Sequence, residues 1–303
     1  CVRGKKVLRV IGHILTFIYF LAIFLSSLLP AAFLYLADIL GIVAFAIFAL
    51  LLARGLTYTQ NVFKYFLRLT LTAFSVELML ILAECFLDMN FPARNVVFTY
   101  AAALGFITGL TLALGSSYML VMRLETNNAN APDPRPYYKS IQPGNYNLPP
   151  WLGLSLGIIT MALSVYASWR MNFALSVYGI LVTSCFYLAL IDPFDTDPED
   201  DDFVNRTVFV KLVRKSVFQH EKHLLRAFLL LLGFNAVYYL IELFLFRSAA
   251  NPAYFYSLLV FLPAVLIPRA SPSNNGKMRL LRYAIFPCSL LIVALLRYLF
   301  VIS

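Results

Sequence analysis

The stretch Val10–Leu29 reads VIGHILTFIYFLAIFLSSLL, and after Pro30 the chain continues over Phe33–Ala53 as FLYLADILGIVAFAIFALLLA. Each stretch has about 20 mostly apolar residues, the length that an α-helix needs to cross the roughly 30 Å hydrocarbon core of a bilayer. Proline is disfavoured inside a helix because it lacks an N–H and clashes with the preceding turn. The sequence therefore predicts two membrane-spanning helices joined as a hairpin at Pro30.

The composition of the whole chain agrees with a membrane protein. Of its 303 residues, 61% are hydrophobic and only 13% are charged, and the mean hydropathy is +0.80. Soluble domains carry about 25% charged residues, which they need to cover their surface. We expect an all-α, multi-pass integral membrane protein whose residues 1–303 form a single transmembrane domain. The sequence does not identify which membrane holds it.

Seven further apolar runs raise the expected number of spans to about nine. The eighth run contains Pro252 and Pro263, is followed directly by Pro268, and is the weakest of the set. Two longer connections, 124–150 and 192–226, lie between spans. The seven runs are Leu69–Asp88, Val96–Met122, Trp151–Trp169, Phe173–Ile191, Ala227–Phe246, Ala249–Ile267 and Tyr283–Ile302.

The positions of the basic residues predict the orientation of these spans. Of 24 Lys and Arg residues, 20 fall on the N-terminal segment or on alternate connections, and the exceptions are Arg94, Arg170, Arg247 and Arg297. Loops rich in Lys and Arg remain on the cytoplasmic side. We therefore expect a cytoplasmic N-terminus, an external C-terminus and two cytoplasmic longer loops. Bases beside apolar runs favour anionic lipid headgroups at the inner face, rather than nucleic acid, as their partner.

The connection Leu56–Arg68 has an amphipathic pattern. On a helix, its Leu, Val, Tyr and Phe side chains fall on one arc, and Gln60, Asn61, Lys64 and Arg68 fall on the other. This pattern predicts a short helix that lies in the inner headgroup layer. The alternative is an ordinary loop packed on the bundle.

Ionisable groups inside the spans are candidate functional residues, because inserting one costs roughly 2.5–3.5 kcal/mol. The spacing of three and four residues in the run Leu69–Asp88 places its acids on one helical face. The run Ala227–Phe246 repeats this theme. We consider either a polar pathway for a cation, proton or solute, or interhelical ion pairs that hold the bundle together. The candidates are Asp38, Glu77, Glu84, Asp88, Asn235, Tyr239, Glu242 and Arg297.

An acidic stretch resembles a metal-binding loop only in part. Seven acids fall in the eleven residues from Asp192 to Asp202. A calcium-binding loop needs a glycine at its turn and a closing glutamate, and this chain has Asp200 and Arg206 at those positions. We therefore interpret the stretch as a solvated acidic loop, and we expect neither a metal site nor a cofactor.

Small residues recur every four positions in two of the runs. Such rows let two helix backbones approach closely in a membrane. The rows predict either a seam within this chain, which we favour, or a contact with another subunit. They consist of Ala101, Gly105 and Gly109 in one run, and of Gly153 and Gly157 in the next.

Three functions are compatible with these features. The first is a transporter or channel-like permease for a small solute or ion, with membrane-embedded carboxylates along its path. The second is a non-catalytic membrane subunit or scaffold of a larger complex, with a protein partner at the cytoplasmic loops. The third is an intramembrane lipid-modifying enzyme that uses the outer carboxylates as acid and base. The sequence contains no phosphate-binding glycine loop, which speaks against a nucleotide-dependent enzyme.

Overall fold

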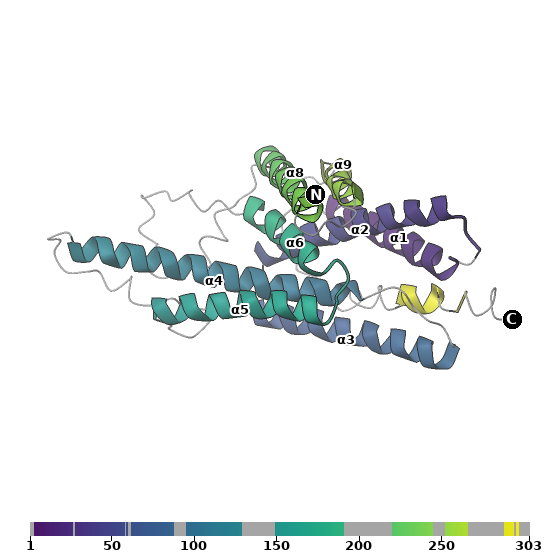
Figure 1. The fold of residues 1–303 in the computed structure, drawn as a ribbon, viewed down its shortest axis with the longest axis horizontal. Helices are drawn as coiled ribbons and strands as arrows, with labels where there is room; N and C mark the ends of the chain where they lie inside the picture. Colours follow the sequence, from purple (N-terminus) through teal and green to yellow (C-terminus); the bar gives the residue numbers. More distant parts are fainter. Residues whose placement is uncertain are drawn as a thin grey trace.

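The computed structural model describes residues 3–26, 28–57, 59, 62–87, 95–128, 149–190, 220–244, 252–265, 288–293 and 295–296. Over these ranges the regular structure is helical, without a β-strand, so the predicted all-α class is confirmed. Figure 1 shows the elements in chain order. They are α1 (Arg3–Phe24), α2 (Ala31–Thr57), α3 (Val62–Leu87), α4 (Val96–Asn128), α5 (Pro150–Arg170), α6 (Ser176–Leu190), α8 (His220–Phe244), the 3₁₀-helix η3 (Pro252–Val260) and α9 (Phe261–Val265).

Six of the described helices are long and apolar enough to cross a membrane. Their candidate spans are Val7–Phe24, Ala31–Leu56, Val62–Leu82, Val96–Ser117, Pro150–Arg170 and Leu224–Phe244. With 15 residues, α6 is about 22 Å long. With 9 and 5 residues, η3 and α9 together reach about 25 Å. The ninth predicted span lies largely outside the described residues, so the structure supports six candidate spans and does not confirm nine.

The first two helices form the predicted hairpin. The carbonyl oxygen of Pro30 accepts hydrogen bonds from the backbone N–H groups of Phe33 at 2.9 Å and Leu34 at 3.4 Å, and so begins α2. At Gly41 the two helices lie so close that an added Cβ would be 2.7 Å from the ring of Tyr19. The turn at Pro30 is therefore confirmed.

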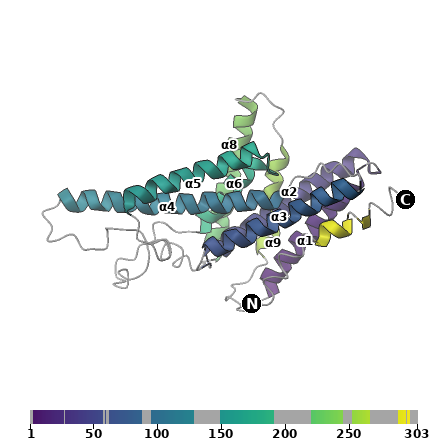
Figure 2. The same ribbon diagram turned by 90° about the horizontal axis from the view of Figure 1, so that it is seen from below.

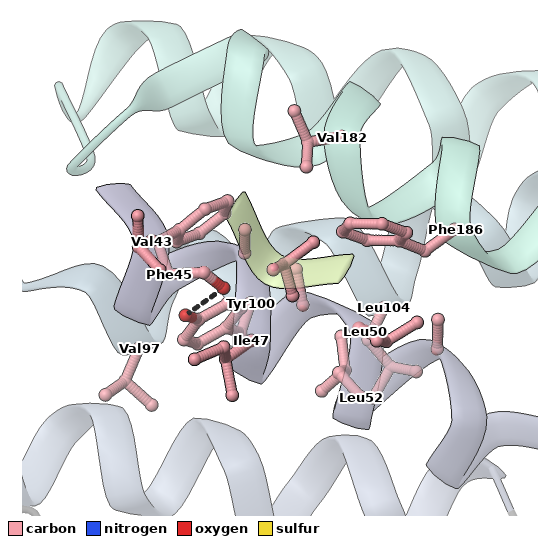
Figure 3. Close-up of a cluster of buried hydrophobic side chains, with 14 of the residues drawn as sticks. Val43, Phe45, Ile47, Leu50, Leu52, Val97, Tyr100, Leu104, Val182 and Phe186 are labelled. Atoms are coloured by element: carbon pink, nitrogen blue, oxygen red, sulfur yellow. Dashed lines mark hydrogen bonds between the residues drawn. The ribbon is translucent and has the colours of Figure 1, made fainter. Parts of the chain in front are cut away.

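The central helix of the fold is α2. Of its candidate span, 61% is buried, compared with 17% for each of α3, α5 and α8. A helix that is apolar on all sides is typically surrounded by others. Figure 3 shows Phe45 and Ile47 of α2 beside Tyr100 of α4, with Phe186 of α6 nearby. The Tyr100 hydroxyl donates to the carbonyl oxygen of Phe45 at 3.1 Å, which fixes α4 against α2.

The beginning of α3 differs from the prediction. It begins at Val62 and continues without interruption to Leu87. The separate headgroup-layer helix predicted over Leu56–Arg68 is wrong, because its first residues end α2 and its last residues form the first turns of α3. The sequence from Val62 to Leu87 contains neither glycine nor proline that would stop the helix.

Two predicted loops are shorter than expected, because the helices beside them are longer. The fourth helix continues to Asn128, past the predicted end at Met122, and α8 begins at His220 rather than Ala227. The remaining parts of the loops 124–150 and 192–226, including the acidic stretch, lie outside the described residues. Figures 1 and 2 both show α5 beside α4.

Candidate functional site

Buried polar groups from three elements meet where α6, α8 and η3 pack together. Asn235 stands near the middle of the candidate span Leu224–Phe244 and is only 1% exposed. Its amide nitrogen donates to Ser257 Oγ at 2.9 Å and to the Tyr254 carbonyl oxygen at 3.2 Å. Its amide oxygen accepts from the Tyr178 hydroxyl at 3.1 Å. Three elements therefore converge on one buried amide.

The hydrogen bonds of this cluster have alternatives. The Tyr178 hydroxyl also lies 3.2 Å from the Tyr254 carbonyl oxygen and 3.3 Å from Ser257 Oγ. Because a hydroxyl has one proton, it donates to one of these acceptors at a time. The same atoms can thus form several bonding patterns without moving far.

Aromatic rings surround the polar atoms. The ring of Tyr178 stacks on that of Tyr254 with centroids 4.2 Å apart, and it meets Tyr238 edge-on at 5.2 Å. Phe234 completes this side, 5.7 Å from Tyr178. Tyrosine combines an apolar ring with a polar end. The cluster therefore has apolar walls, while its hydroxyl groups provide polar contacts.

The other two predicted residues of α8 also lie beside η3. The half-buried carboxylate of Glu242 accepts a hydrogen bond from the Tyr238 hydroxyl, and Tyr254 lies near it. The ring centroid of Tyr239 is 5.9 Å from that of Phe255. The polar side chains of α8 therefore extend from the middle of the helix to its last turns, along η3.

Prolines explain the irregular backbone at the site. Pro252 begins η3, and Pro263 within α9 cannot donate the hydrogen bond that an α-helix requires there. Non-α backbone at membrane depth is tolerated where protein covers it or where it lines a cavity. Here α2 and α8 cover η3, and a hydrogen bond joins the side chains of Tyr256 and Tyr35.

The predicted acids of α3 lie apart from this cluster. Helix α3 packs on α4 through a face that contains Leu69, Ala73 and Val76. Half-buried Glu77 and exposed Glu84 lie at one edge of that face, about 50–75° around the helix from its centre. Asp38 is exposed near the beginning of α2. Among the described residues, no three His, Cys, Asp or Glu side chains form a group that could hold a metal ion. Asp88 and Arg297 lie outside the described residues.

The small-residue rows lie at the contact between α4 and α5. A Cβ on Gly109 would be 2.6 Å from the carbonyl oxygen of Gly157, and one on Gly157 would be 2.7 Å from the backbone nitrogen of Ala113. A Cβ on Gly105 would meet only the Ser164 hydroxyl, at 2.8 Å. Ala101 and Gly153 of these rows are also buried. The two backbones therefore touch at Gly109 and Gly157.

Sequence reasoning missed the partners of Asn235, namely Tyr254 and the pair Tyr178 and Ser257. Serine and tyrosine are common in apolar helices, and no spacing rule links residues that are 79 positions apart, the separation of this pair. One weak signal is present, since Ser257 lies between Pro252 and Pro263, two prolines that interrupt the eighth apolar run. Polar residues in such a segment are candidates for a buried polar cluster or for the lining of a cavity.

The chemistry of the cluster is that of neutral polar groups with one carboxylate nearby. No protein-family model, no curated protein and no solved structure matches this chain. Amide, hydroxyl and carbonyl groups bind polar solutes through hydrogen bonds. Carbonyl oxygens and a carboxylate also bind hard cations.

Proposed function

We propose that this membrane protein is a permease for a small polar solute or cation, with its path beside α8 and η3. The observation that carries the proposal is the Tyr178–Asn235–Ser257 cluster at the middle of the candidate span Leu224–Phe244. Transporters typically bind their substrates near the bilayer midplane, at helices whose regular backbone is interrupted. The proposal assigns Asn235, Tyr239 and Glu242 to this path.

The 3₁₀ backbone of η3 supports the same function. Stretches of 3₁₀-helix longer than three or four residues are uncommon and often mark a hinge, and η3 has nine residues. Its Tyr254 carbonyl oxygen already accepts side-chain hydrogen bonds. In the proposed permease this oxygen exchanges those partners for the solute.

Glu242→Gln is expected to reduce cation or proton uptake into proteoliposomes at least about tenfold, because it removes the charge that attracts the cation beside the cluster. Uptake is measured with proton- and sodium-sensitive dyes inside the vesicles, at equal yields of folded protein. Glu84→Gln is the matched control, since it makes the same change on an exposed side chain of α3. Glu77→Gln is also expected to retain uptake. Equal uptake by the wild type and Glu242→Gln would contradict a path for ions at α8.

We further propose that the chain crosses the membrane nine times, with α6 and the η3–α9 segment as short crossings that the bilayer accommodates by local thinning. The segregation of 20 of the 24 bases supports this layout. A tag after Ser303 is then expected to react with a membrane-impermeant reagent only from the side opposite to a tag before Cys1. Reaction of both tags from one side would exclude an odd number of crossings.

The exposed side of α3 favours a second candidate, a membrane subunit that packs on a helix of another protein. Glu77 lies inside the candidate span Val62–Leu82, on a helix that is only 17% buried, and it is only half-buried. A carboxylate beside lipid is unfavourable, and a partner helix would cover it. A stoichiometric partner in mild detergent, with uptake unaffected by Glu242→Gln, would favour this candidate. A partner-free particle would count against it.

A further inference from the structure

The turn between α5 and α6 forms a hollow on the surface. Its volume is about 400 Å³, and it is lined by Trp169, Arg170, Asn172 and Ser176. The Ser176 hydroxyl donates to the carbonyl oxygen of Ser168 at 3.3 Å, so it ties the beginning of α6 to the end of α5. Asn172 and Ser176 have positive φ angles of 54° and 37°, which gives the turn a defined, compact shape.

Arg170 brings an exposed positive charge to this hollow. Arg170 is one of the four Lys and Arg residues that lie outside the N-terminal segment and the alternate connections, where the other 20 are found. The sequence of α5, Pro150–Arg170, contains no acid, and in the part of the chain that the structure describes no carboxylate pairs with this guanidinium. The N-terminal end of α6 also faces the turn, and its dipole favours an anion there. The hollow therefore attracts a negatively charged group.

The two tryptophans of the chain mark the depth of the hollow in the membrane. Trp151 and Trp169 lie at opposite ends of α5, and both are exposed. Eighteen residues of helix separate them, which is about 27 Å and close to the thickness of the hydrocarbon core. Tryptophan collects at the level of the headgroups. Arg170, which follows Trp169, therefore lies at headgroup level.

An exposed stripe leads from Arg170 towards the middle of α5. Ile159, Leu163, Tyr166 and Arg170 are separated by four, three and four residues, so they share one helical face. The three uncharged side chains are 52%, 61% and 57% exposed. From Arg170 towards the middle of α5, this face is an apolar surface that an acyl chain can contact.

We propose that the α5–α6 turn is a phospholipid-binding site. The phosphate of the headgroup binds Arg170 within the hollow, beside the N-terminal end of α6, and the indole of Trp169 packs against the glycerol region. One acyl chain lies along Tyr166, Leu163 and Ile159. The site thus explains why a base is present at this turn although the other bases gather on alternate connections.

The test is native mass spectrometry of the full-length protein in detergent, with phosphatidylglycerol as the probe. Arg170→Gln is expected to reduce lipid adducts about tenfold, the loss typical of a hydrogen bond to a charged group. Arg170→Lys retains the charge and is expected to keep most of the adducts. Arg68→Gln, at an exposed arginine of α3 outside the hollow, is the matched control for general attraction to headgroups and is expected to lose far fewer adducts than Arg170→Gln. Equal adducts for Arg170→Gln and Arg68→Gln would overturn the site.

Two further probes separate a lipid from a free phosphate. Dioleoylglycerol has the acyl chains without a phosphate, and it is expected to give no adduct that depends on Arg170. Glycerol phosphate has the phosphate without the chains, and at millimolar concentration it is expected to leave the bound phosphatidylglycerol in place. Displacement of the lipid by glycerol phosphate would assign the hollow to a soluble phosphate and would overturn the proposal. Adducts of dioleoylglycerol that depend on Arg170 would also overturn it.

Discussion

Gly109→Ala and Gly157→Ala are each expected to destabilise the protein by about 1–3 kcal/mol, the cost typical of overpacking a close-packed interior. The new methyl group of Gly109→Ala would lie 2.6 Å from the carbonyl oxygen of Gly157. That of Gly157→Ala would lie 2.7 Å from the backbone nitrogen of Ala113. Because these contacts are with backbone atoms, a side-chain rotation cannot relieve them, and α4 and α5 must separate. Both variants act on one contact, so their effects are expected to add only in part.

Two other glycines of α4 provide graded controls. Gly105→Ala meets only the hydroxyl of Ser164, which can rotate away, and it is expected to cost less. Gly115→Ala meets no atom within 4 Å, and it is expected to leave stability unchanged or to raise it by up to about 1 kcal/mol, because alanine has the higher helix propensity. Unfolding in detergent with increasing denaturing surfactant, followed by circular dichroism, measures the series. Equal stability of the Gly109→Ala and Gly115→Ala variants would contradict the proposed tight contact.

The helices themselves could be predicted from the sequence, because a bilayer leaves the backbone few alternatives to helix. The turn at Pro30 could be predicted as well, since proline ends a helix. The beginning of α3 could not be predicted from polarity. Lys64 and Arg68 indicated a boundary near Leu69, but their long side chains can reach the headgroups while the backbone remains helical. The helix therefore begins at Val62.

Periodicity could not predict which neighbouring helix the face with Glu77 and Glu84 would meet. The spacing of Glu77 and Glu84 indicates correctly that the two share a face. It does not indicate which neighbour that face meets, because this depends on the small and branched side chains that pack on α4, among them Ala73 and Val76. Asn95 contributes too, since it accepts a hydrogen bond from the Val97 N–H at 3.0 Å and donates to the carbonyl oxygen of Ala73 at 2.7 Å. These contacts place Glu77 and Glu84 at the edge of the α3 surface that packs on α4.

The hydrogen-bond partners of Asn235 could not be predicted from the sequence either. Asn235 could be selected because an amide in the middle of an apolar span needs partners. Its partners Tyr178 and Ser257 come from helices 57 and 22 positions away. Only the packing of α6 and η3 against α8 brings the three together.

Asn235→Ala is expected to destabilise the protein by about 2–3 kcal/mol. The change removes three hydrogen bonds, which average roughly 0.6 kcal/mol each between helices in a membrane, and it leaves a small cavity. The surfactant titration used for the glycine variants measures the loss. Tyr239→Phe is the control, because it removes one hydroxyl from the next turn of α8 and is expected to stay within about 0.5 kcal/mol of the wild type.

The same variant separates a binding site from a structural contact. If the cluster only joins α6, α8 and η3, uptake into proteoliposomes is expected to return once a stabilising lipid or lower temperature restores the folded fraction of Asn235→Ala. If the cluster binds the solute, uptake stays low even when all of the protein is folded. Tyr178→Phe sharpens the comparison, since it retains the 4.2 Å ring contact with Tyr254 and loses only the hydroxyl. Full uptake by folded Asn235→Ala and by folded Tyr178→Phe would remove the cluster from the proposed path.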